Sequence, residues 1–129
     1  MTIGVGIDVV AIDRIARALD EHGGRFERRV FTQGEIDDCS GRVDRILALA
    51  ARFAAKEACL KALGTGWSSG LGFRDVEVER DAAGPPRLRL HGAAAERASE
   101  IGATRFHLSL THEATVAAAV VVLEGPSET

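Results

Sequence analysis

Lysine occurs at two positions in this chain, Lys56 and Lys61, and a glutamate, Glu57, directly follows the first of them. Every other strongly basic side chain is an arginine. Lysine carries a compact charge on a flexible stem, whereas arginine presents a planar fork. Two ammonium groups kept beside one carboxylate indicate a site that handles phosphate or another anion. Lys61 and Lys56 are both candidate clamps for that anion.

Glu57 falls on the apolar side of a long helix that we expect at about residues 43–63. At about 100° per residue, four apolar side chains share its direction: Ile46, Ala50, Phe53 and Leu60. An unpaired carboxylate there would cost roughly several kcal/mol. Glu57 therefore needs a cation, a partner, or a place where the helix leaves the core for a cleft. The structural alternative is an ion pair with Lys61, one helical turn later.

Asp8 poses the same problem in an apolar strand expected at residues 3–10. Alternation puts Ile3, Val5, Ile7 and Val9 on one face and Gly4, Gly6, Asp8 and Val10 on the other. The glycine face lets a helix backbone approach closely and bring Glu57 beside Asp8. Two facing carboxylates repel unless a hard cation or a shared proton lies between them. The alternative for Asp8 is a buried aspartate bonded to the backbone.

Magnesium suits such a pair, because it takes one or two carboxylates together with water and the phosphate oxygens of a substrate. The spacing of cysteine and histidine offers no zinc motif.

The turn Gly64-Thr65-Gly66 could bring backbone N–H groups to a phosphate, although a plain helix cap explains it equally well. His112 and Glu113 lie at an expected strand connection, where exposed residues often serve function.

Five arginines gather near the first helix of an acidic chain: Arg14, Arg17, Arg25, Arg28 and Arg29. Such a cluster is usually a solvated face, and the alternative is a docking patch for an acidic partner.

Composition narrows the classes of function. The chain has 129 residues, which is one domain by length, and a net charge of −3, which argues against nucleic-acid binding. No apolar run approaches the roughly 20 residues of a membrane span, and the N-terminus lacks the features of a signal peptide. Cys39 and Cys59 indicate reduced thiols in a cytoplasmic protein. Aromatic residues are scarce, at 5%, and a lean core often relies on subunit association.

The order of elements favours an α+β fold, a mostly antiparallel sheet packed on one long helix and shorter helices. We expect a single domain at residues 1–124 and a frayed tail at 125–129. Helices are expected from an N-cap at Asp13 to about Asp20, from a capping box at Thr32, at about 43–63, and at about Ala93–Ile101. Further strands are expected at Phe73–Glu79, Arg87–Leu90, Arg105–Leu110 and Thr115–Leu123. The last of these should be central and buried on both faces.

Several segments together resemble the holo-acyl-carrier-protein synthases, small homotrimeric 4′-phosphopantetheinyl transferases. They are Gly6-Ile-Asp8-Val-Val-Ala-Ile-Asp-Arg14-Ile15, Phe31-Thr-Gln-Gly-Glu35-Ile36, Arg52-Phe-Ala-Ala-Lys-Glu57-Ala-Cys-Leu-Lys61-Ala-Leu-Gly-Thr-Gly66, and His107-Leu-Ser-Leu-Thr-His112 with Ala117-Ala-Ala-Val-Val. The segments occur in the family's order and cover nearly the whole chain.

The resemblance implies a function in fatty acid biosynthesis, with polyketide biosynthesis as a second pathway in which the same reaction could serve. It implies that the chain transfers the phosphopantetheine of coenzyme A to a serine of an apo acyl carrier protein, releasing adenosine 3′,5′-bisphosphate. It also implies a homotrimer in the cytoplasm with sites between subunits, and a phosphopantetheinyl transferase fold. The cation would be Mg²⁺, with Mn²⁺ possible.

The resemblance also assigns residues. Asp8 and Glu57 match the metal ligands, Lys61 matches the phosphate-binding lysine, and Glu57 or a metal-bound water would be the base. Positions expected around coenzyme A are Arg52, Lys61, Gly64, Thr65, Gly66, Pro86, Thr111 and His112. Positions expected to dock the carrier protein are Arg14, Arg17, Arg25 and Arg28.

Two rival functions use the same residues. One is another magnesium-dependent phosphohydrolase or nucleotidyl transferase that uses the carboxylates. The other is a non-catalytic trimeric module that binds an acidic protein through its arginines.

Overall fold

The computed structural model describes residues 1–65, 72–80 and 84–127. Its helices are α1 (Ile12–His22), α2 (Gly24–Val30), α3 (Gln33–Cys39), α4 (Arg45–Ala62), the 3₁₀ turn η1 (Phe73–Asp75) and α5 (Gly92–Glu100). Its strands are β1 (Thr2–Ala11), β2 (Val76–Glu79), β3 (Arg87–Leu90), β4 (Arg105–Glu113) and β5 (Val116–Glu124). The expected α+β class, with antiparallel sheets around one long helix, is confirmed.

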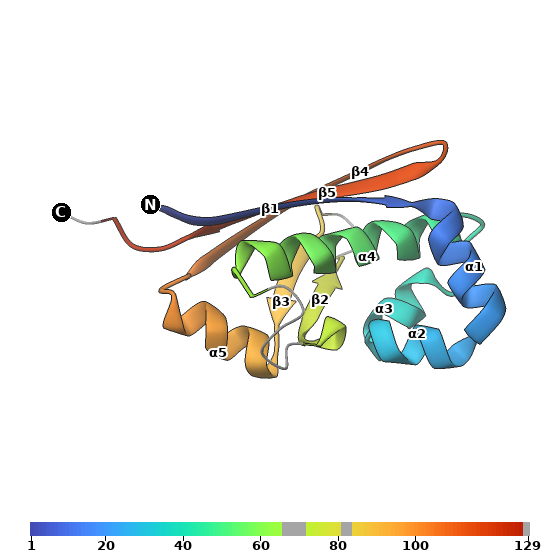
Figure 1. Ribbon diagram of the computed structural model, residues 1–129, viewed down its shortest axis with the longest axis horizontal. Coiled ribbons are helices and arrows are strands. Elements are labelled where there is room, and N and C mark those ends of the chain that lie inside the picture. Colours follow the sequence, from blue (N-terminus) through green and yellow to red (C-terminus); the bar gives the residue numbers. More distant parts are fainter. Residues whose placement is uncertain (66–71, 81–83, 128–129) are drawn as a thin grey trace.

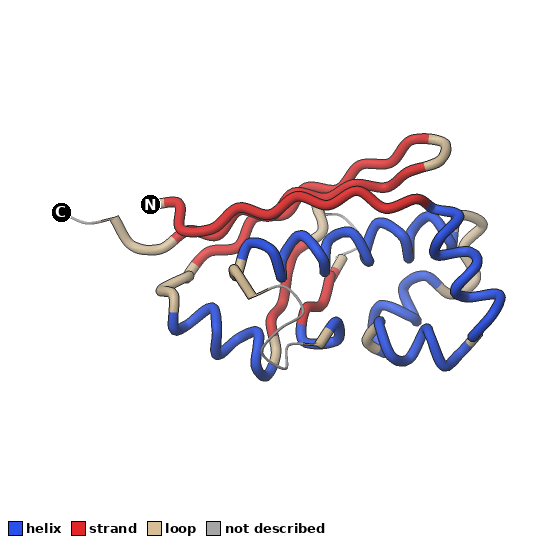
Figure 2. The backbone as a smooth tube through the Cα atoms, viewed as in Figure 1, coloured by secondary structure: helices blue, strands red, loops and turns tan. Residues whose placement is uncertain are grey.

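A three-stranded antiparallel sheet in the order β1-β5-β4 lies along α4, and β2 pairs with β3 in a second, smaller sheet (Figure 1). In the larger sheet Asp8 stands opposite Ala119, and Leu110 stands opposite Ala119 from the other side. Helices α1 to α3 gather near one end of α4, and α5 lies toward the other end (Figure 2). None of the described helices is long and apolar enough to cross a membrane.

The glycine face of β1 lies directly against the backbone of α4. A Cβ atom built on Gly6 would lie 1.8 Å from the carbonyl oxygen of Ala58, and one on Gly4 would lie 2.3 Å from that of Ala62. Such distances are far inside van der Waals contact, so only glycine permits this approach. The expected close packing of strand and helix is confirmed, and it brings Asp8 onto the side of β1 that faces α4.

Helix α4 is the centre of the core rather than an amphipathic surface helix. Residues 48–56 are all buried, and so are 58–60 and Ala62. Ile46, expected in the apolar stripe, is 40% exposed. Glu57 is half-buried and Lys61, one turn later, is exposed, so these two side chains lie on the side of α4 that solvent reaches.

Some expected boundaries are wrong for local reasons. Helix α1 begins at Ile12 without a side-chain cap, and Asp13 instead pairs with Arg17 at 2.8 Å. A separate helix, α2, occupies Gly24–Val30, where we expected none. The hairpin turns at residues 114–115, so His112 and Glu113 belong to β4 rather than to the connection. The capping box at Thr32 is confirmed, with Glu35 as its partner.

The outer face of the larger sheet is apolar and open along β1 and β5, whereas β4 carries polar side chains there. Val5, Ile7 and Val9 are 60%, 63% and 60% exposed. The neighbouring outer positions of β5 are only half-buried, while its inner positions are buried. Strand β5 is therefore central, as expected, but it is buried on one face in the single chain rather than on both.

Candidate active site

The first cluster joins β1 to the C-terminal half of α4. The ammonium group of Lys61 lies 3.1 Å from Oδ1 of Asp8 and donates to the carbonyl oxygen of Ile7 at 3.0 Å. The Asp8 side chain is 16% exposed and that of Lys61 is 52% exposed. The ion pair made by Lys61 therefore runs to the neighbouring strand, and the simple pairing within α4 is not the arrangement found. The lysine therefore stays accessible to solvent beside Asp8.

The negative charge of Asp8 affects the pKa of Glu57. Burial raises the pKa of the Glu57 carboxyl above its usual range, and the negative charge of Asp8 raises it further, while Arg14 and Lys61 act in the opposite direction. A carboxylate whose ionisation is made more costly by a neighbouring negative charge attracts a proton or a cation. The expected convergence of β1 and α4 on a pair of carboxylates is supported by this coupling.

Asp8 and Glu57 suit a magnesium ion in number and chemistry. The described residues hold no group of three or more histidine, cysteine or acidic side chains that could bind a metal. Two carboxylates are the protein share that Mg²⁺ commonly takes when substrate phosphates and water complete its coordination. The donor set thus fits a cation that arrives with a phosphate-containing substrate.

Lys56, the other candidate clamp, is not available to a ligand. Its side chain is 0% exposed and its ammonium group lies 2.6 Å from Oε1 of Glu35, which is also fully buried. It also donates to the carbonyl oxygens of Val76 and Phe73 at 2.5 and 3.1 Å. Burial lowers the pKa of Lys56, and Glu35 opposes this. The interpretation of Lys56 as an anion clamp is wrong, because three acceptors in the protein already occupy it.

The turn after α4 is a helix cap. Gly64 has a φ of 78°, its N–H donates to Lys61, and the N–H of Thr65 donates to Leu60 at 3.4 Å. This is the Schellman arrangement, in which both amides serve the helix end. Gly66, the third residue of the expected phosphate turn, lies outside the described residues. A phosphate contact by this segment stays a prediction.

A second cluster lines a cavity of about 350 Å³ on another side of α4. It contains three expected coenzyme A positions, Arg52, Pro86 and His112, and two arginines that sequence reasoning missed, Arg42 and Arg80. Asp44 also lines the cavity and accepts two hydrogen bonds from Arg42 at 2.9 Å. The surplus of positive charge therefore comes from Arg52 and Arg80, and it suits an anionic ligand. Their separation along the chain gave no pattern that could have found Arg42 or Arg80; only the fold brings them together.

Arg52 is the most unusual member of this second cluster. It is 3% exposed, and Nη1 donates to the carbonyl oxygen of Ala48 at 3.2 Å. Nη2 lies 4.0 Å from a carboxylate oxygen of Asp38. Its Nε is buried without an acceptor among the described residues. Because buried polar groups are normally bonded, a guanidinium left in this state beside a cavity is suited to a ligand's oxygen.

The two clusters do not meet within one chain. Arg52 and Lys61 are nine positions apart on α4, which places them about 13 Å apart along the axis and on nearly opposite sides. Thr111, also expected near coenzyme A, is exposed and belongs to the outer face of the sheet, where it stands opposite Ala118. His112, the next residue, points to the other face and lines the cavity.

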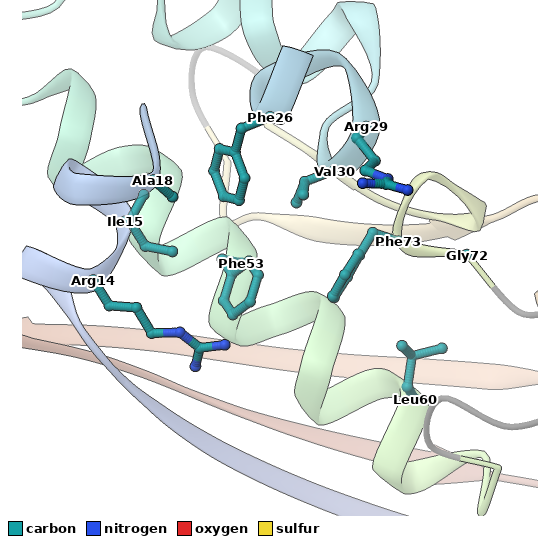
Figure 3. A pocket seen from close by; sticks show the side chains of 10 residues that line it. All are labelled: Arg14, Ile15, Ala18, Phe26, Arg29, Val30, Phe53, Leu60, Gly72 and Phe73. Atoms are coloured by element: carbon teal, nitrogen blue, oxygen red, sulfur yellow. The ribbon is translucent and has the colours of Figure 1, made fainter. Parts of the chain in front are cut away.

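A third feature is an apolar cavity of about 480 Å³ between α1, α2, α4 and η1. The rings of Phe26, Phe53 and Phe73 surround it, together with the guanidinium groups of Arg14 and Arg29 (Figure 3). The Arg14 guanidinium lies 5.4 Å from the centre of the Phe53 ring. The remaining arginines expected to dock a partner, Arg17, Arg25 and Arg28, are exposed on α1 and α2.

Comparison with known proteins gives a consistent result. Residues 4–120 match the 4′-phosphopantetheinyl transferase superfamily. The chain is 51% identical over 128 residues to a holo-acyl-carrier-protein synthase of Methylobacterium radiotolerans, covering 96% of this chain and 94% of that protein. It is also 51% identical over 124 residues to the enzyme of that name from Nitratidesulfovibrio vulgaris, covering 96% of this chain and 99% of that protein.

Solved structures agree with this result. The crystal structure of the holo-acyl-carrier-protein synthase from Neisseria meningitidis superposes with a TM-score of 0.86 at 36% identity, covering 96% of this chain and 99% of that one. The Helicobacter pylori synthase in complex with coenzyme A superposes with a TM-score of 0.79 at 32% identity, covering 93% and 99%.

Proposed function

Because this chain belongs to the 4′-phosphopantetheinyl transferase superfamily, we propose that it carries out the reaction for which its relatives are named, with the residues described above. It transfers the 4′-phosphopantetheine group of coenzyme A to a serine hydroxyl of an apo acyl carrier protein. The serine oxygen forms a bond to the β-phosphorus, the pyrophosphate bond breaks, and adenosine 3′,5′-bisphosphate leaves. The observation that carries the assignment of the site is the pairing of Asp8 on β1 with Lys61 and Glu57 on α4.

Asp8 and Glu57 are the residues that would hold the magnesium or manganese ion. When bound, the cation would neutralise the charge of the pyrophosphate and polarise its oxygens. Lys61 contributes a mobile ammonium group at the same place, and it can pass from Asp8 to a phosphate oxygen as the substrate arrives. Charge neutralisation and positioning supply most of the catalysis in phosphoryl transfer, and these side chains provide both.

Glu57 is also the proposed acceptor of the serine proton at one of its carboxylate oxygens. Burial and the charge of Asp8 raise the pKa of Glu57. In the metal-free protein this raised pKa would make Glu57 a better general base than an ordinary glutamate, and a bound cation would lower the pKa again.

We propose that the rest of coenzyme A lies against the second cluster of a neighbouring subunit. Arg52, with its unbonded Nε, and His112 would contact phosphate oxygens there. Because Arg52 and Lys61 face away from each other on α4, a single chain cannot easily bring both to one coenzyme A molecule. An active site shared between two subunits resolves this.

The outer face of the larger sheet supports a homotrimer. Val5, Ile7 and Val9 form an exposed apolar row, and exposed patches of this kind mark interfaces. Val120 and Val122, which stand opposite Ile7 and Val5 on β5, extend the row. Burying this face between copies would complete the lean core and bring sites of adjacent subunits together.

We propose that the carrier protein docks on α1 and α2. The apolar cavity beneath Arg14 and Arg29 suits an amphipathic acidic helix. The acidic side chains of that helix would meet the two arginines at the edge of the cavity, and its apolar side chains would enter the cavity. Arg14 also acts on the charge of Glu57, so this surface lies next to the carboxylates. The docked serine would then be presented to the reacting phosphate.

We place the reaction in the cytoplasm. Cys39 and Cys59 are buried free thiols, and unpaired cysteines are usual in a reducing compartment.

The test is to mix the purified protein with apo carrier protein, coenzyme A and Mg²⁺ and to weigh the carrier by mass spectrometry. We expect a gain of one phosphopantetheine group. Coenzyme A consumed without transfer would favour a phosphohydrolase or nucleotidyl transferase, and stable binding without chemistry would favour a non-catalytic module.

A further inference from the structure

The ammonium group of the buried Lys56 is fully hydrogen-bonded, and only one of its three partners is the carboxylate of Glu35. A lysine ammonium group has three donors, and those of Lys56 meet Glu35, the carbonyl oxygen of Val76 and the carbonyl oxygen of Phe73 at 2.6, 2.5 and 3.1 Å. Two of the three acceptors are backbone atoms of η1 and β2. The charge of Lys56 is therefore used to hold one particular segment of backbone against α4.

Glu35 completes this arrangement from α3. Its Oε1 also accepts from the N–H of Thr32 at 2.9 Å, and its Oε2 accepts from the N–H of Val78 at 2.9 Å. The pair thus joins the start of α3, the middle of α4 and the η1–β2 segment. Apolar residues of similar volume often stabilise a core as well as a buried ion pair does. The particular gain from this pair is a fixed position for the backbone atoms that it binds.

The fixed segment forms a wall of the apolar cavity. Phe73, whose carbonyl oxygen binds Lys56, contributes its ring to the cavity beside that of Phe53, with ring centres 5.3 Å apart (Figure 3). Lys56 also directly precedes Glu57. One side chain therefore ties the wall of the cavity to the helical turn that carries a reacting carboxylate.

We propose that Lys56 and Glu35 are positioning residues for the carrier protein: they hold Phe73 so that the cavity keeps the shape that receives an apolar side chain of the docked helix. This inference rests on the proposed docking at the cavity. It assigns the pair to recognition of the protein substrate and not to binding of coenzyme A. Loss of the pair should therefore raise the KM for the carrier while leaving that for coenzyme A nearly unchanged.

The test removes both charges together, because a single substitution would strand the other charge in the core. Glu35→Leu with Lys56→Met is compared with Leu123→Ala, which destabilises the buried face of β5 without touching η1. All proteins are assayed at a temperature where circular dichroism shows them folded. We expect the paired variant to raise the KM for the carrier on the order of tenfold, with that for coenzyme A within about twofold, and Leu123→Ala to change neither by more than about twofold.

A double-mutant cycle with Phe73→Ala shows whether the pair acts through the cavity wall. Phe73→Ala alone should raise the carrier KM, and it should add little in the paired variant, because its ring is already misplaced. Additive effects, or an equal rise in the KM for coenzyme A, would overturn the positioning role while leaving the docking site intact. No effect of Phe73→Ala alone would overturn both the docking site and the inference.

If the paired variant fails to fold, the unaltered protein gives the answer by NMR. Titration with apo carrier should shift the ring resonances of Phe73 and the ammonium resonance of Lys56. Coenzyme A added without carrier should shift neither. A Phe73 ring that responds to carrier while Lys56 does not would refute the coupling between them.

Discussion

The ammonium group of Lys61 lies 3.1 Å from Oδ1 of Asp8, so a side chain of α4 is anchored on β1 at the carboxylate proposed to hold the cation. A lysine and a divalent cation repel each other at close range. We therefore expect Lys61 to turn toward the pyrophosphate when cation and coenzyme A bind together. The contact with Asp8 keeps the lysine at the site until then.

Lys61→Met should lower kcat/KM for coenzyme A on the order of a hundredfold, because it removes a positive charge that meets developing negative charge. Lys61→Arg should retain more activity, since it keeps the charge but changes its shape. Because Lys61 is 52% exposed, thermal unfolding should change little. An unaltered kcat/KM in the methionine variant would remove Lys61 from the site.

Glu57→Gln should abolish transfer while the subunits stay associated, as measured by carrier mass and by light scattering. Full activity in this variant would exclude Glu57 as metal ligand and base. A matched control is Glu100→Gln, an exposed position on α5, which should retain full activity.

The same substitution should also change the pH dependence of stability in metal-free protein. Folding raises the pKa of Glu57 above its ordinary value of 4.5. The group therefore contributes stability below about pH 4.5, and this contribution is lost as pH rises through the folded pKa. Glu57→Gln should have a higher urea midpoint than the unaltered protein at pH 7, and the difference should shrink on acidification. A difference that grows on acidification would contradict the direction of the pKa shift.

Gly6→Ala should destabilise the fold by at least about 1–3 kcal/mol, because the new methyl group would overlap the backbone of α4. Its Cβ would lie 1.8 Å from the carbonyl oxygen of Ala58. Gly72→Ala is the control, since its Cβ would meet nothing within 4 Å. Urea unfolding of the two variants measures the contrast, and equal stability would disprove the close packing of β1 on α4.

Arg14→Glu should raise the KM for the carrier about tenfold at low salt and progressively less as salt increases, because exposed charge pairs are screened. Arg89→Glu on β3 makes the same change in net charge away from α1 and should have little effect. A salt-independent response, or equal responses of the two variants, would argue against docking at Arg14.

Much of the first cluster could be predicted because its evidence is local. The bare glycine face of β1 correctly predicted the close packing on α4. The apolar stripe expected around Glu57 was not found, because α4 is buried on nearly all sides and Ile46 is exposed. The role of Asp8 and Glu57 as metal ligands stays a prediction. Lys56 and Lys61 could not be told apart in this way. Both lie beside Glu57, and what separates them is a buried partner, Glu35, from a different helix.

The second cluster and the hairpin show more clearly which features could not be predicted from the sequence. Arg42 and Arg80 come close to Arg52 only through tertiary folding. Their spacing along the chain contains no pattern that predicts this cluster. The turn at residues 114–115 was misplaced because His112 and Glu113 are polar and resemble a connection. In the fold they continue the ladder with Ala117 and Val116, since hydrogen bonding to β5 outweighs the local preference of their side chains.

The most direct test of the site is the position of the metal in crystals grown with coenzyme A and Mn²⁺. We predict one anomalous scattering peak per chain, in contact with carboxylate oxygens of both Asp8 and Glu57 and with the pyrophosphate. A peak bound to other side chains, or a coenzyme A pyrophosphate located away from these two carboxylates, would contradict the mechanism.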